Sequence, residues 1–310
     1  MRVVVSEFME EAALGAFPPG VEVVYAPDLV EDREALTQSV AGADGLIVRN
    51  RTQVDHALLE AAPKLRVVGR LGVGLDTIDM GACKARGVAV RPATGANTLS
   101  VAEYVISATL TLLRGAYMSN AAMIAGDWPR GALIGGEAAG RCMGLYGFGG
   151  IARAVALRAQ ALGMHVAAHD PFLAEDDPAW EGVTRATPEE LFERADVLSL
   201  HVPLTDATRG LIGAEALAAM RPGAILINTA RGGIVDEAAL AAAPKAGRLG
   251  GAALDVFAAE PLTAEAGAVF AGVPNLILTP HIAGVTQEGN VRVSHLTVAN
   301  VMEELGLGRA

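Results

Sequence analysis

The segment Gly147-Phe-Gly-Gly-Ile-Ala152 lies between an apolar run and a helical pattern. Residues 142–146 are predicted to form a strand, and residues 151–162 a helix. The segment matches the pattern G-x-G-x-x-G/A, in which the first glycine permits a tight turn and the second brings the backbone close to a pyrophosphate. The last position must be small, and Ala152 meets that need. We therefore predict that the phosphates of a dinucleotide bind at the N-terminus of this helix, through Gly147, Gly149 and Gly150.

Asp170 indicates which dinucleotide is bound. It follows the next predicted strand, residues 165–169, at the distance of about 20 residues typical of this motif. An acidic side chain there can bind both hydroxyls of an adenosine ribose and would repel the 2′-phosphate of NADP. No arginine directly follows Asp170. We therefore predict NAD as the cofactor; the alternative is a glycine-rich turn that holds no ligand.

Predicted strands alternate with helical patterns along nearly the whole chain. Asp32, Asp55 and Asp79 are placed to cap helices in the first half, and Thr187-Pro-Glu-Glu190 reads as a capping box in the second. This alternation predicts parallel sheets with helices on both faces, in two α/β units. The predicted strands are 2–5, 21–25, 45–48, 65–69, 142–146, 165–169, 197–201, 224–228, 251–254 and 276–278.

Two long helices are also predicted. Ser100-Val-Ala-Glu103 fits a capping box, so a helix is expected to begin there and to run to about Arg114. This helix is the expected bridge between the two units. The last helix is expected to start near Gln287 and to end at about Leu305.

The composition excludes several classes of protein. The 310 residues include 35 acidic and 24 basic side chains, and the net charge of −11 argues against a diffuse nucleic-acid-binding surface. Apolar residues make up 52% and charged residues 19%, which excludes a disordered chain. No apolar run approaches the ~20 residues of a membrane span, and no signal peptide is recognised. Cys83 and Cys142 cannot form a disulfide framework. We expect a cytoplasmic enzyme with a small-molecule substrate, no metal site, and no nucleic-acid or membrane partner.

Arg231, Glu260 and His281 each follow a predicted strand in the second half of the chain. In open α/β sheets the ligand crevice lies outside the carboxyl ends of the strands, so the three side chains are expected near a bound nicotinamide. A histidine can exchange the hydroxyl proton during hydride transfer, and a neighbouring carboxylate orients the ring and favours its protonated form. An arginine can bind a substrate carboxylate bidentately. Each residue alone could equally be structural.

Several longer stretches resemble the D-isomer-specific 2-hydroxyacid dehydrogenase family, which includes phosphoglycerate, glycerate and D-lactate dehydrogenases. They occur in the family's order and cover nearly the whole chain. Departures are Ala152 in the glycine turn, Asn50, where a small hydroxyl residue is common, and Pro244, which interrupts the predicted helix after Asp236. The stretches are Gly69-Arg-Leu-Gly-Val-Gly-Leu-Asp76, Asn97-Thr-Leu-Ser-Val-Ala-Glu103, Gly144-Leu-Tyr-Gly-Phe-Gly-Gly-Ile151, His201-Val-Pro-Leu204, Asn228-Thr-Ala-Arg-Gly-Gly-Ile-Val-Asp236, Ala252-Ala-Leu-Asp-Val-Phe257, Glu260-Pro261 and Thr279-Pro-His-Ile-Ala-Gly284.

The resemblance implies a fold of two doubly wound parallel-sheet domains. A Rossmann NAD-binding domain, residues 98–284, would be inserted in a flavodoxin-like substrate domain, residues 1–97 and 285–310. Arg231, Glu260 and His281 would be catalytic. The substrate carboxylate is expected at Arg231 and at the backbone of Gly72, Val73 and Gly74. The implied cofactor contacts are Gly147, Gly149, Gly150, Ile151, Asp170, Val202, Pro203, Thr229, Ala230, Asp255 and Gly284, with Asp255 holding the nicotinamide carboxamide.

The substrate is left open among several 2-hydroxy acids. Arg49, Arg51 and Arg70 lie on segments expected to face the substrate, and Arg49 is the candidate for binding a second anionic group. That reading favours an acid such as 3-phosphoglycerate or 3-sulfolactate; glycerate, glyoxylate and D-lactate types are the alternative. A non-enzymatic NAD-sensing corepressor and a formate-type dehydrogenase are further alternatives, and the Arg231, Glu260 and His281 set argues against both. The family resemblance also implies a homodimer through residues 97–130.

Overall fold

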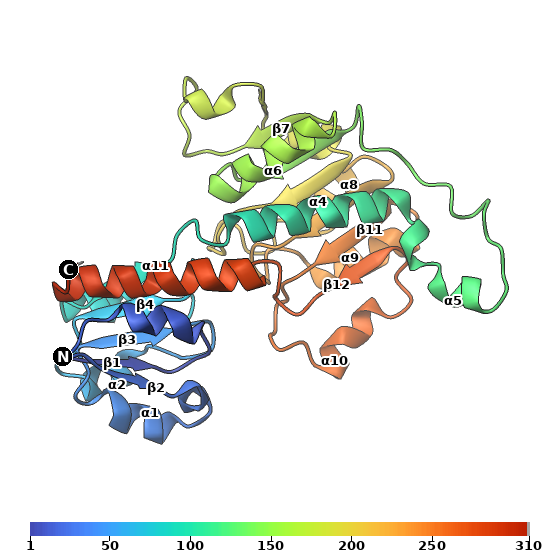
Figure 1. Ribbon diagram of the computed structural model, residues 1–310. Coiled ribbons are helices and arrows are strands. Elements are labelled where there is room, and N and C mark those ends of the chain that lie inside the picture. Colours follow the sequence, from blue (N-terminus) through green and yellow to red (C-terminus); the bar gives the residue numbers. More distant parts are fainter. Residues whose placement is uncertain (309–310) are drawn as a thin grey trace. The chain divides into compact units, whose positions relative to one another are not determined.

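The structure is a computed structural model of the chain, and it describes residues 1–308. The chain forms two compact units. The first contains residues 1–97 and the segment from Val285 onward, and the second, Thr98–Gly284, is inserted between them. Each unit has its own parallel sheet with helices packed on it, which confirms the predicted fold class (Figure 1).

The first unit contains a five-stranded sheet in the order β2-β1-β3-β4-β5, and all its neighbouring strands pair in parallel. This is the flavodoxin-like order. Its strands are β1 (Arg2–Val5), β2 (Glu22–Tyr25), β3 (Gly45–Val48), β4 (Val67–Arg70) and β5 (Ala89–Pro92). Its helices are η1 (Glu11–Ala16), η2 (Pro27–Glu31), α1 (Arg33–Val40), α2 (His56–Ala61), α3 (Met80–Ala85) and α11 (Gln287–Leu305).

Local signals in the sequence explain where these helices begin. The side chains of Asp32, Asp55 and Asp79 each accept a hydrogen bond from the backbone three residues on, as the sequence predicted. The predicted last helix is also confirmed, and Thr286 caps it. Strand β5 was not predicted, because the run Ala-Val-Arg-Pro is short and its proline is typical of an edge strand.

The second unit contains a seven-stranded parallel sheet in the order β12-β11-β10-β9-β6-β7-β8. The order reverses between β6 and β9, which is the switch point where such sheets bind ligands. The strands are β6 (Cys142–Tyr146), β7 (His165–His169), β8 (Thr184–Arg185), β9 (Val197–Leu200), β10 (Ala224–Asn228), β11 (Leu249–Leu254) and β12 (Leu276–Leu278). The helices are α4 (Thr98–Arg114), η3 (Ala116–Met118), α5 (Asn120–Ile124), α6 (Gly150–Ala161), η4 (Pro178–Trp180), α7 (Pro188–Arg194), α8 (Ala214–Ala219), α9 (Glu237–Lys245), α10 (Ala264–Gly267) and η5 (Ala268–Phe270).

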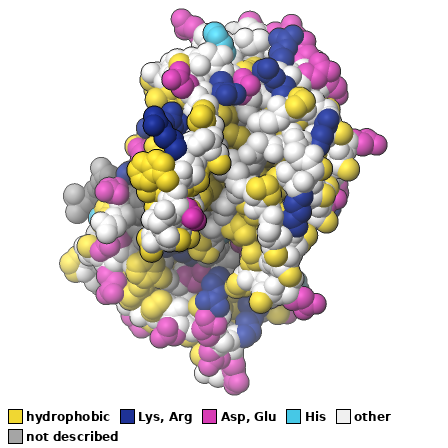
Figure 2. All heavy atoms as spheres, turned by 90° about the vertical axis from the view of Figure 1, so that its right-hand side faces the viewer, with side chains coloured by type: hydrophobic (Ala, Val, Ile, Leu, Met, Phe, Trp, Pro, Cys, Tyr) yellow, Lys and Arg dark blue, Asp and Glu magenta, His cyan; other side chains and the backbone are white. Residues whose placement is uncertain are grey.

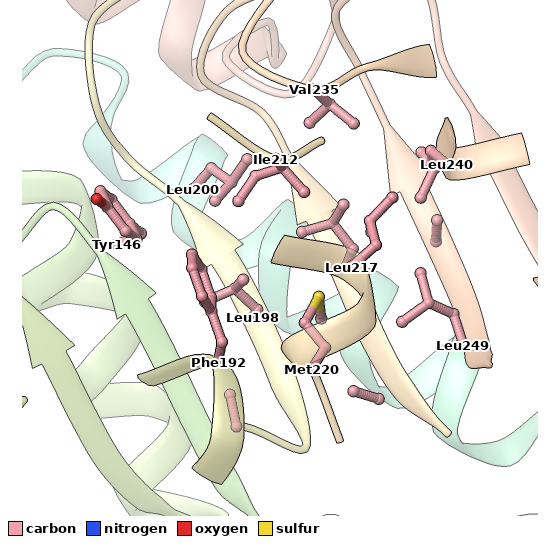
Figure 3. Packing of buried hydrophobic residues seen from close by; sticks show 14 of the residues in the cluster. Tyr146, Phe192, Leu198, Leu200, Ile212, Leu217, Met220, Val235, Leu240 and Leu249 are labelled. Atoms are coloured by element: carbon pink, nitrogen blue, oxygen red, sulfur yellow. The ribbon is translucent and has the colours of Figure 1, made fainter. Parts of the chain in front are cut away.

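Two apolar layers cover the faces of this sheet. On one face, side chains of α7, α8 and α9 pack against the strands, including Phe192, Leu217 and Leu240 (Figure 3). On the other face, α4 and α6 pack against the sheet through Val105, Val155 and their neighbours. The predicted capping box of α7 is present, since Thr187 and Glu190 exchange side-chain to backbone bonds. The start of α4 was predicted wrongly: the helix begins at Thr98, and Ser100 is buried within its first turn instead of capping it.

The surface carries charges of both signs. Figure 2 shows acidic side chains spread over much of the face turned to the viewer, with Lys and Arg side chains among them and no continuous basic patch on that face. None of the helices in residues 1–308 combines the length and the apolar character needed to cross a bilayer.

Gly69 explains how α11 packs on the sheet of the first unit. A Cβ atom at Gly69 would lie 2.5 Å from Val301 Cγ2 and 2.9 Å from Thr297 Cγ2, and both residues are fully buried. The Gly69→Ala substitution should therefore lower the free energy of unfolding by about 1–3 kcal/mol, because overpacking forces the helix away from β4. Chemical denaturation measures this. Gly15→Ala is the matched control, since a Cβ there meets nothing within 4 Å and should change stability little. Equal stability of the two variants would contradict this packing.

Candidate active site

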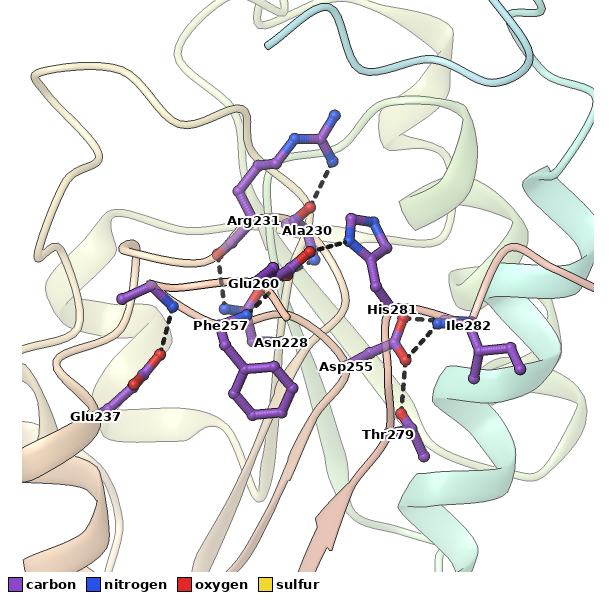
Figure 4. Close-up of polar contacts among 12 residues, drawn as sticks. Asn228, Ala230, Arg231, Glu237, Asp255, Phe257, Glu260, Thr279, His281 and Ile282 are labelled. Atoms are coloured by element: carbon purple, nitrogen blue, oxygen red, sulfur yellow. Dashed lines mark hydrogen bonds and ion pairs between the residues drawn. The ribbon is translucent and has the colours of Figure 1, made fainter. Parts of the chain in front are cut away.

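His281 and Glu260 form a hydrogen-bonded pair at one edge of the seven-stranded sheet. Glu260 follows β11 and His281 follows β12, and these strands are parallel neighbours, so their carboxyl ends meet at the same edge. His281 Nδ1 lies 2.7 Å from Glu260 Oε2, and the two side chains keep 37% and 32% of their surfaces exposed (Figure 4). This pairing leaves Nε2 of the imidazole able to exchange a proton with a ligand.

The Glu260 carboxyl is held in its ionised form. Partial burial alone would raise its pKa, but the hydrogen bonds from His281 and from the Phe257 amide, with the charges of His281 and Arg231, outweigh burial and lower the pKa. The second oxygen, Oε1, accepts the Phe257 N–H at 2.9 Å. Glu260 is therefore fixed at both oxygens and supplies a negative charge beside the imidazole.

The backbone of His281 adopts an unusual conformation that its neighbours impose. Its φ of +53° lies in the left-handed region, which non-glycine residues rarely adopt. The His281 N–H donates to the carbonyl of Asp255 at 2.8 Å, and the buried Asp255 carboxylate accepts the N–H groups of Ile282 and Ala283 at 2.8 Å each. The Asp255 backbone and side chain thus fix the loop that carries His281.

A hydroxyl chain leads to the same carboxylate. Thr279 Oγ1 donates to Asp255 Oδ1 at 2.6 Å, and the Tyr104 hydroxyl lies 2.6 Å from Thr279 Oγ1. A carboxylate offers about four acceptor positions, and three are occupied here, which leaves one for the carboxamide that Asp255 is predicted to hold. The role of Thr279 and Tyr104 was missed from the sequence, because Tyr104 is 175 residues away from Thr279.

Arg231 joins this site from β10, the next strand of the sheet (Figure 4). The buried Asn228 side chain shapes the turn that leads from β10 to Arg231. Its Nδ2 donates to the Arg231 carbonyl at 2.9 Å, and its Oδ1 accepts the Ala230 N–H at 3.0 Å. The residue after Arg231 must be glycine, because a Cβ at Gly232 would lie 1.7 Å from the Phe257 carbonyl oxygen. Three adjacent strands thus bring together three side chains that are far apart in the sequence.

The glycine turn has the geometry that a pyrophosphate needs. Gly147 has a φ of +90°, and a Cβ there would lie 2.6 Å from the His201 carbonyl oxygen. A Cβ at Gly149 or Gly150 would meet nothing within 4 Å, so the backbone at the start of α6 is open to a ligand. Asp170 accepts the Phe148 N–H from the turn at 2.8 Å and therefore also fixes its shape.

Two buried polar atoms near the carboxyl ends of β9 and β10 support a bound dinucleotide. Thr229 Oγ1 and His201 Nε2 have no hydrogen-bond partner among residues 1–308. Burial lowers the pKa of His201 to about 4, so the ring is neutral at physiological pH. Among the remaining predicted contacts, Val202, Pro203 and Ala230 also follow these strands, Ile151 lies in the first turn of α6, and Gly284 lies in the loop after β12. The residues present therefore fit the predicted cofactor. Within the described chain, no cluster of three or more His, Cys, Asp or Glu could hold a metal ion.

Apart from Arg231, the predicted substrate-binding residues lie in the first unit, at the ends of two paired strands. Arg49 follows β3, and Gly72, Val73 and Gly74 follow β4, its parallel neighbour. The Gly72 N–H already donates to the Arg70 carbonyl at 2.8 Å, which leaves the N–H groups of Val73 and Gly74 for a carboxylate.

The three arginines singled out from the sequence differ in their surroundings. Arg49 is half-buried and donates to the Phe8 carbonyl and to Asn290 Oδ1. Arg51 is exposed and forms an ion pair with Glu31 at 2.6 Å. Arg70 lies over Gly72, where a Cβ would meet its guanidinium at 1.7 Å.

Comparisons with known proteins show the family of the chain. Residues 106–283 match the family model described as D-isomer specific 2-hydroxyacid dehydrogenase, NAD binding domain. The chain is 58% identical over 306 residues to the (S)-sulfolactate dehydrogenase of Chromohalobacter salexigens, covering 98% of each chain. It is 40% identical to the D-3-phosphoglycerate dehydrogenase of Mycobacterium leprae over 94% of this chain, but spans only 54% of that longer protein.

Solved structures show the same architecture. The fold superposes on a protein from Thermus thermophilus with a TM-score of 0.90 at 35% identity, covering 99% of this chain and 97% of that one. A glyoxylate reductase from Paecilomyes thermophila gives a TM-score of 0.85 at 27% identity, covering 98% and 94% of the two chains. The chain belongs to the D-isomer specific 2-hydroxyacid dehydrogenase family and is an NAD-dependent oxidoreductase of 2-hydroxy acids.

Proposed function

We propose that this chain is a 3-sulfolactate dehydrogenase, which interconverts (S)-3-sulfolactate and 3-sulfopyruvate with NAD(H). The observation that carries the proposal is the 58% identity to an enzyme of that name across 98% of both chains. A half-buried arginine, Arg49, at the end of β3 supports it, because such a side chain can bind a second anionic group.

The descriptor (S) agrees with the D-isomer specificity of the family. At C2 of lactate the carboxyl group ranks above the methyl group, and the D isomer is therefore (R). At C2 of sulfolactate the sulfonate-bearing carbon ranks above the carboxyl group, because sulfur outranks oxygen. The same spatial arrangement is then named (S), so (S)-sulfolactate presents its hydroxyl, carboxylate and hydrogen as D-lactate does.

The side chains of the second unit can perform the proton transfer. Bound NAD supplies the hydride acceptor for the C2 hydrogen. His281 Nε2 takes the proton from the substrate hydroxyl, while Glu260 stabilises the imidazolium through Nδ1. Arg231 binds the substrate carboxylate and polarises the adjoining oxygen. In the reverse direction the protonated His281 donates to the oxygen of the 2-oxo group.

Residues of the first unit are proposed to bind the two anionic groups of the substrate. Among these residues, Val73 and Gly74 are proposed to bind the carboxylate through their N–H groups, and Arg49 is proposed to bind the sulfonate. Asp170 is proposed to bind the adenosine ribose, and Asp255 the nicotinamide carboxamide. The other predicted cofactor residues are proposed to contact the rest of the dinucleotide; they lie in the glycine turn, at the start of α6 and in the loops after β9, β10 and β12.

We also propose a cytoplasmic homodimer. The segment after α4 supports the dimer, because apolar side chains are exposed along it and α5 stands off from its own sheet (Figure 1). The free thiols of Cys83 and Cys142 suit a reducing compartment. A single-chain mass in sedimentation equilibrium would refute the dimer. The exposed side chains are Tyr117, Met118, Met123, Ile124, Trp128 and Ile134.

The His281→Ala and Arg231→Ala substitutions should each lower kcat/KM for oxoacid reduction by about 10²–10⁴-fold, because they remove the proton donor or the carboxylate-binding group. Steady-state kinetics with NADH measures this, and thermal unfolding should show that both variants are folded. His295→Ala, at an exposed position of α11, is the matched control and should retain activity. Retained activity in both catalytic variants would refute the assignment.

The Glu260→Gln substitution should lower kcat/KM for oxoacid reduction by about 10- to 100-fold, as expected for the loss of a charged hydrogen bond. The lowered pKa of Glu260 keeps its carboxylate ionised, and that charge stabilises the imidazolium from which the substrate takes its proton. Glutamine has the same size but no charge. Steady-state kinetics with NADH measures the loss. Glu260→Asp keeps the charge and should retain more activity; an unchanged kcat/KM in Glu260→Gln would contradict the proposed pair.

A panel of 2-oxoacids with NADH tests the substrate. Sulfopyruvate should give the highest kcat/KM, ahead of phosphohydroxypyruvate, hydroxypyruvate, glyoxylate and pyruvate. Arg49→Ala should lower kcat/KM for sulfopyruvate by about 10- to 100-fold, as expected for the loss of charged hydrogen bonds. Arg51→Ala, in the same loop, is the matched control, because its charge already pairs with Glu31. A higher kcat/KM for hydroxypyruvate or glyoxylate would instead favour the glycerate type.

A further inference from the structure

Glu7 is a buried carboxylate outside the site described so far. Its residue is only 4% exposed, and its two oxygens accept four consecutive backbone N–H groups. Oε1 accepts those of Arg49 at 2.7 Å and Thr52 at 2.9 Å, and Oε2 accepts those of Asn50 at 3.2 Å and Arg51 at 3.1 Å. The loop from Arg49 to Thr52 is thus wrapped around one carboxylate, as a nest of N–H groups wraps around an anion.

This arrangement fixes the backbone of the loop. A buried carboxylate is costly unless its lone pairs are matched, and here the four N–H groups match them. These four N–H groups have no acceptor in a strand or helix. The carboxylate therefore supplies the acceptors that the N–H groups need, and they supply the donors that the carboxylate needs. Ser6 and Thr52 add a buried hydroxyl contact of 3.0 Å next to it.

The guanidinium of Arg49 is oriented by a second set of contacts. Nη1 donates to the Phe8 carbonyl at 3.2 Å, Nη2 donates to Asn290 Oδ1 at 2.8 Å, and the group lies 5.9 Å from the centre of the Phe8 ring. Burial lowers the pKa of Arg49, and the negative charge of Glu7 partly offsets this. Arginine nevertheless stays protonated at physiological pH.

The acceptors around Arg49 are both neutral, which distinguishes it from Arg51. The Arg51 guanidinium is neutralised by the Glu31 carboxylate. The Arg49 guanidinium is held by a carbonyl and an amide oxygen, and two of its five N–H groups are used in this way. It therefore keeps its charge and further donors for an anion.

We propose that Glu7 and Asn290 are positioning residues that hold Arg49 in the geometry needed to bind the sulfonate of the substrate. Glu7 fixes the backbone of Arg49, and Asn290 fixes its guanidinium. The two residues thereby set the preference for 2-oxoacids with a second anionic group. This inference rests on the proposed role of Arg49 in binding the substrate.

The Asn290→Ala and Glu7→Gln variants test the proposal. In Glu7→Gln one carboxylate oxygen becomes an NH₂ group that faces two N–H donors, so the loop should lose its conformation. Each variant should lower the ratio of kcat/KM for sulfopyruvate to that for the best monoanionic oxoacid by about tenfold, mainly through the KM for sulfopyruvate. A merely structural defect would lower both activities alike and leave the ratio unchanged, which would overturn the proposal.

Asn300→Ala is the matched control for Asn290→Ala. Asn300 lies on the same helix, α11, and donates through Nδ2 to the Pro92 carbonyl at 3.1 Å. Its removal also deletes one side-chain hydrogen bond of α11 but has no contact with Arg49, so the ratio should stay at the wild-type value. A drop in the ratio of Asn300→Ala equal to that of Asn290→Ala would show a general effect of the helix and would overturn the proposal.

The double variant Arg49→Ala with Asn290→Ala separates this inference from the proposed function. If Asn290 acts through Arg49, its substitution should change the ratio no further once Arg49 is alanine. Equal effects of Asn290→Ala with and without Arg49 would overturn the positioning role while leaving Arg49 as a substrate ligand. An unchanged ratio in the single Arg49→Ala variant would instead refute the sulfonate-binding role itself, and the inference with it.

Discussion

Parallel strand pairing is the constraint on which both units depend. Because every strand of a parallel sheet runs in the same direction, the carboxyl ends of all strands reach one edge, and the segments that follow them become neighbours. In the second unit this brings together Arg231, Glu260 and His281, which follow β10, β11 and β12. In the first unit it places Arg49 beside the Gly72 loop, after β3 and β4. The proposed site residues therefore lie on segments that have no regular secondary structure of their own.

Carboxylate side chains fix the backbone of these segments by accepting hydrogen bonds from it. Backbone N–H groups beyond a strand end have no partner in the sheet, and each must find an acceptor elsewhere. Glu7 accepts four of them, Asp255 accepts two at the loop of His281, and Asp170 accepts one from the glycine turn. Glu260 does both tasks at once, since Oε1 binds the Phe257 amide while Oε2 orients His281. Several acidic residues of this chain thus fix the backbone of the loops that carry the proposed site residues.

The sequence predicts the parts of the structure that depend on local pattern. The glycine turn, most strands and the capping residues Asp32, Asp55 and Asp79 are recognisable because neighbouring residues alone determine them. The start of α4 was misplaced because Ser100 has the residue type of a cap while its side chain is buried. Strand β8 has only two residues, too few to form a pattern.

The contacts that orient the site residues could not be predicted in the same way. Glu7 binds a loop more than 40 residues away, and Thr279 binds Asp255 across 24 residues. Such hydrogen bonds produce no recognisable pattern in the sequence, because their partners become neighbours only when the sheet forms. The sequence likewise could not separate Arg49 from Arg51: both are arginines in one loop, and only their contacts show that Arg51 is neutralised by Glu31.

The acidic character of the chain is compatible with a doubly charged substrate. The net charge of −11 would repel an anion at long range, but salt screens exposed charges beyond about 8 Å at physiological ionic strength. Within that distance the nearest groups dominate, and Arg49 is half-buried, held by neutral acceptors and screened less than a surface side chain. The Glu7 charge beside it is spread over four N–H dipoles instead of forming a direct bond to the guanidinium. A buried acid can therefore fix the loop of an anion-binding arginine without cancelling the positive charge that the arginine provides.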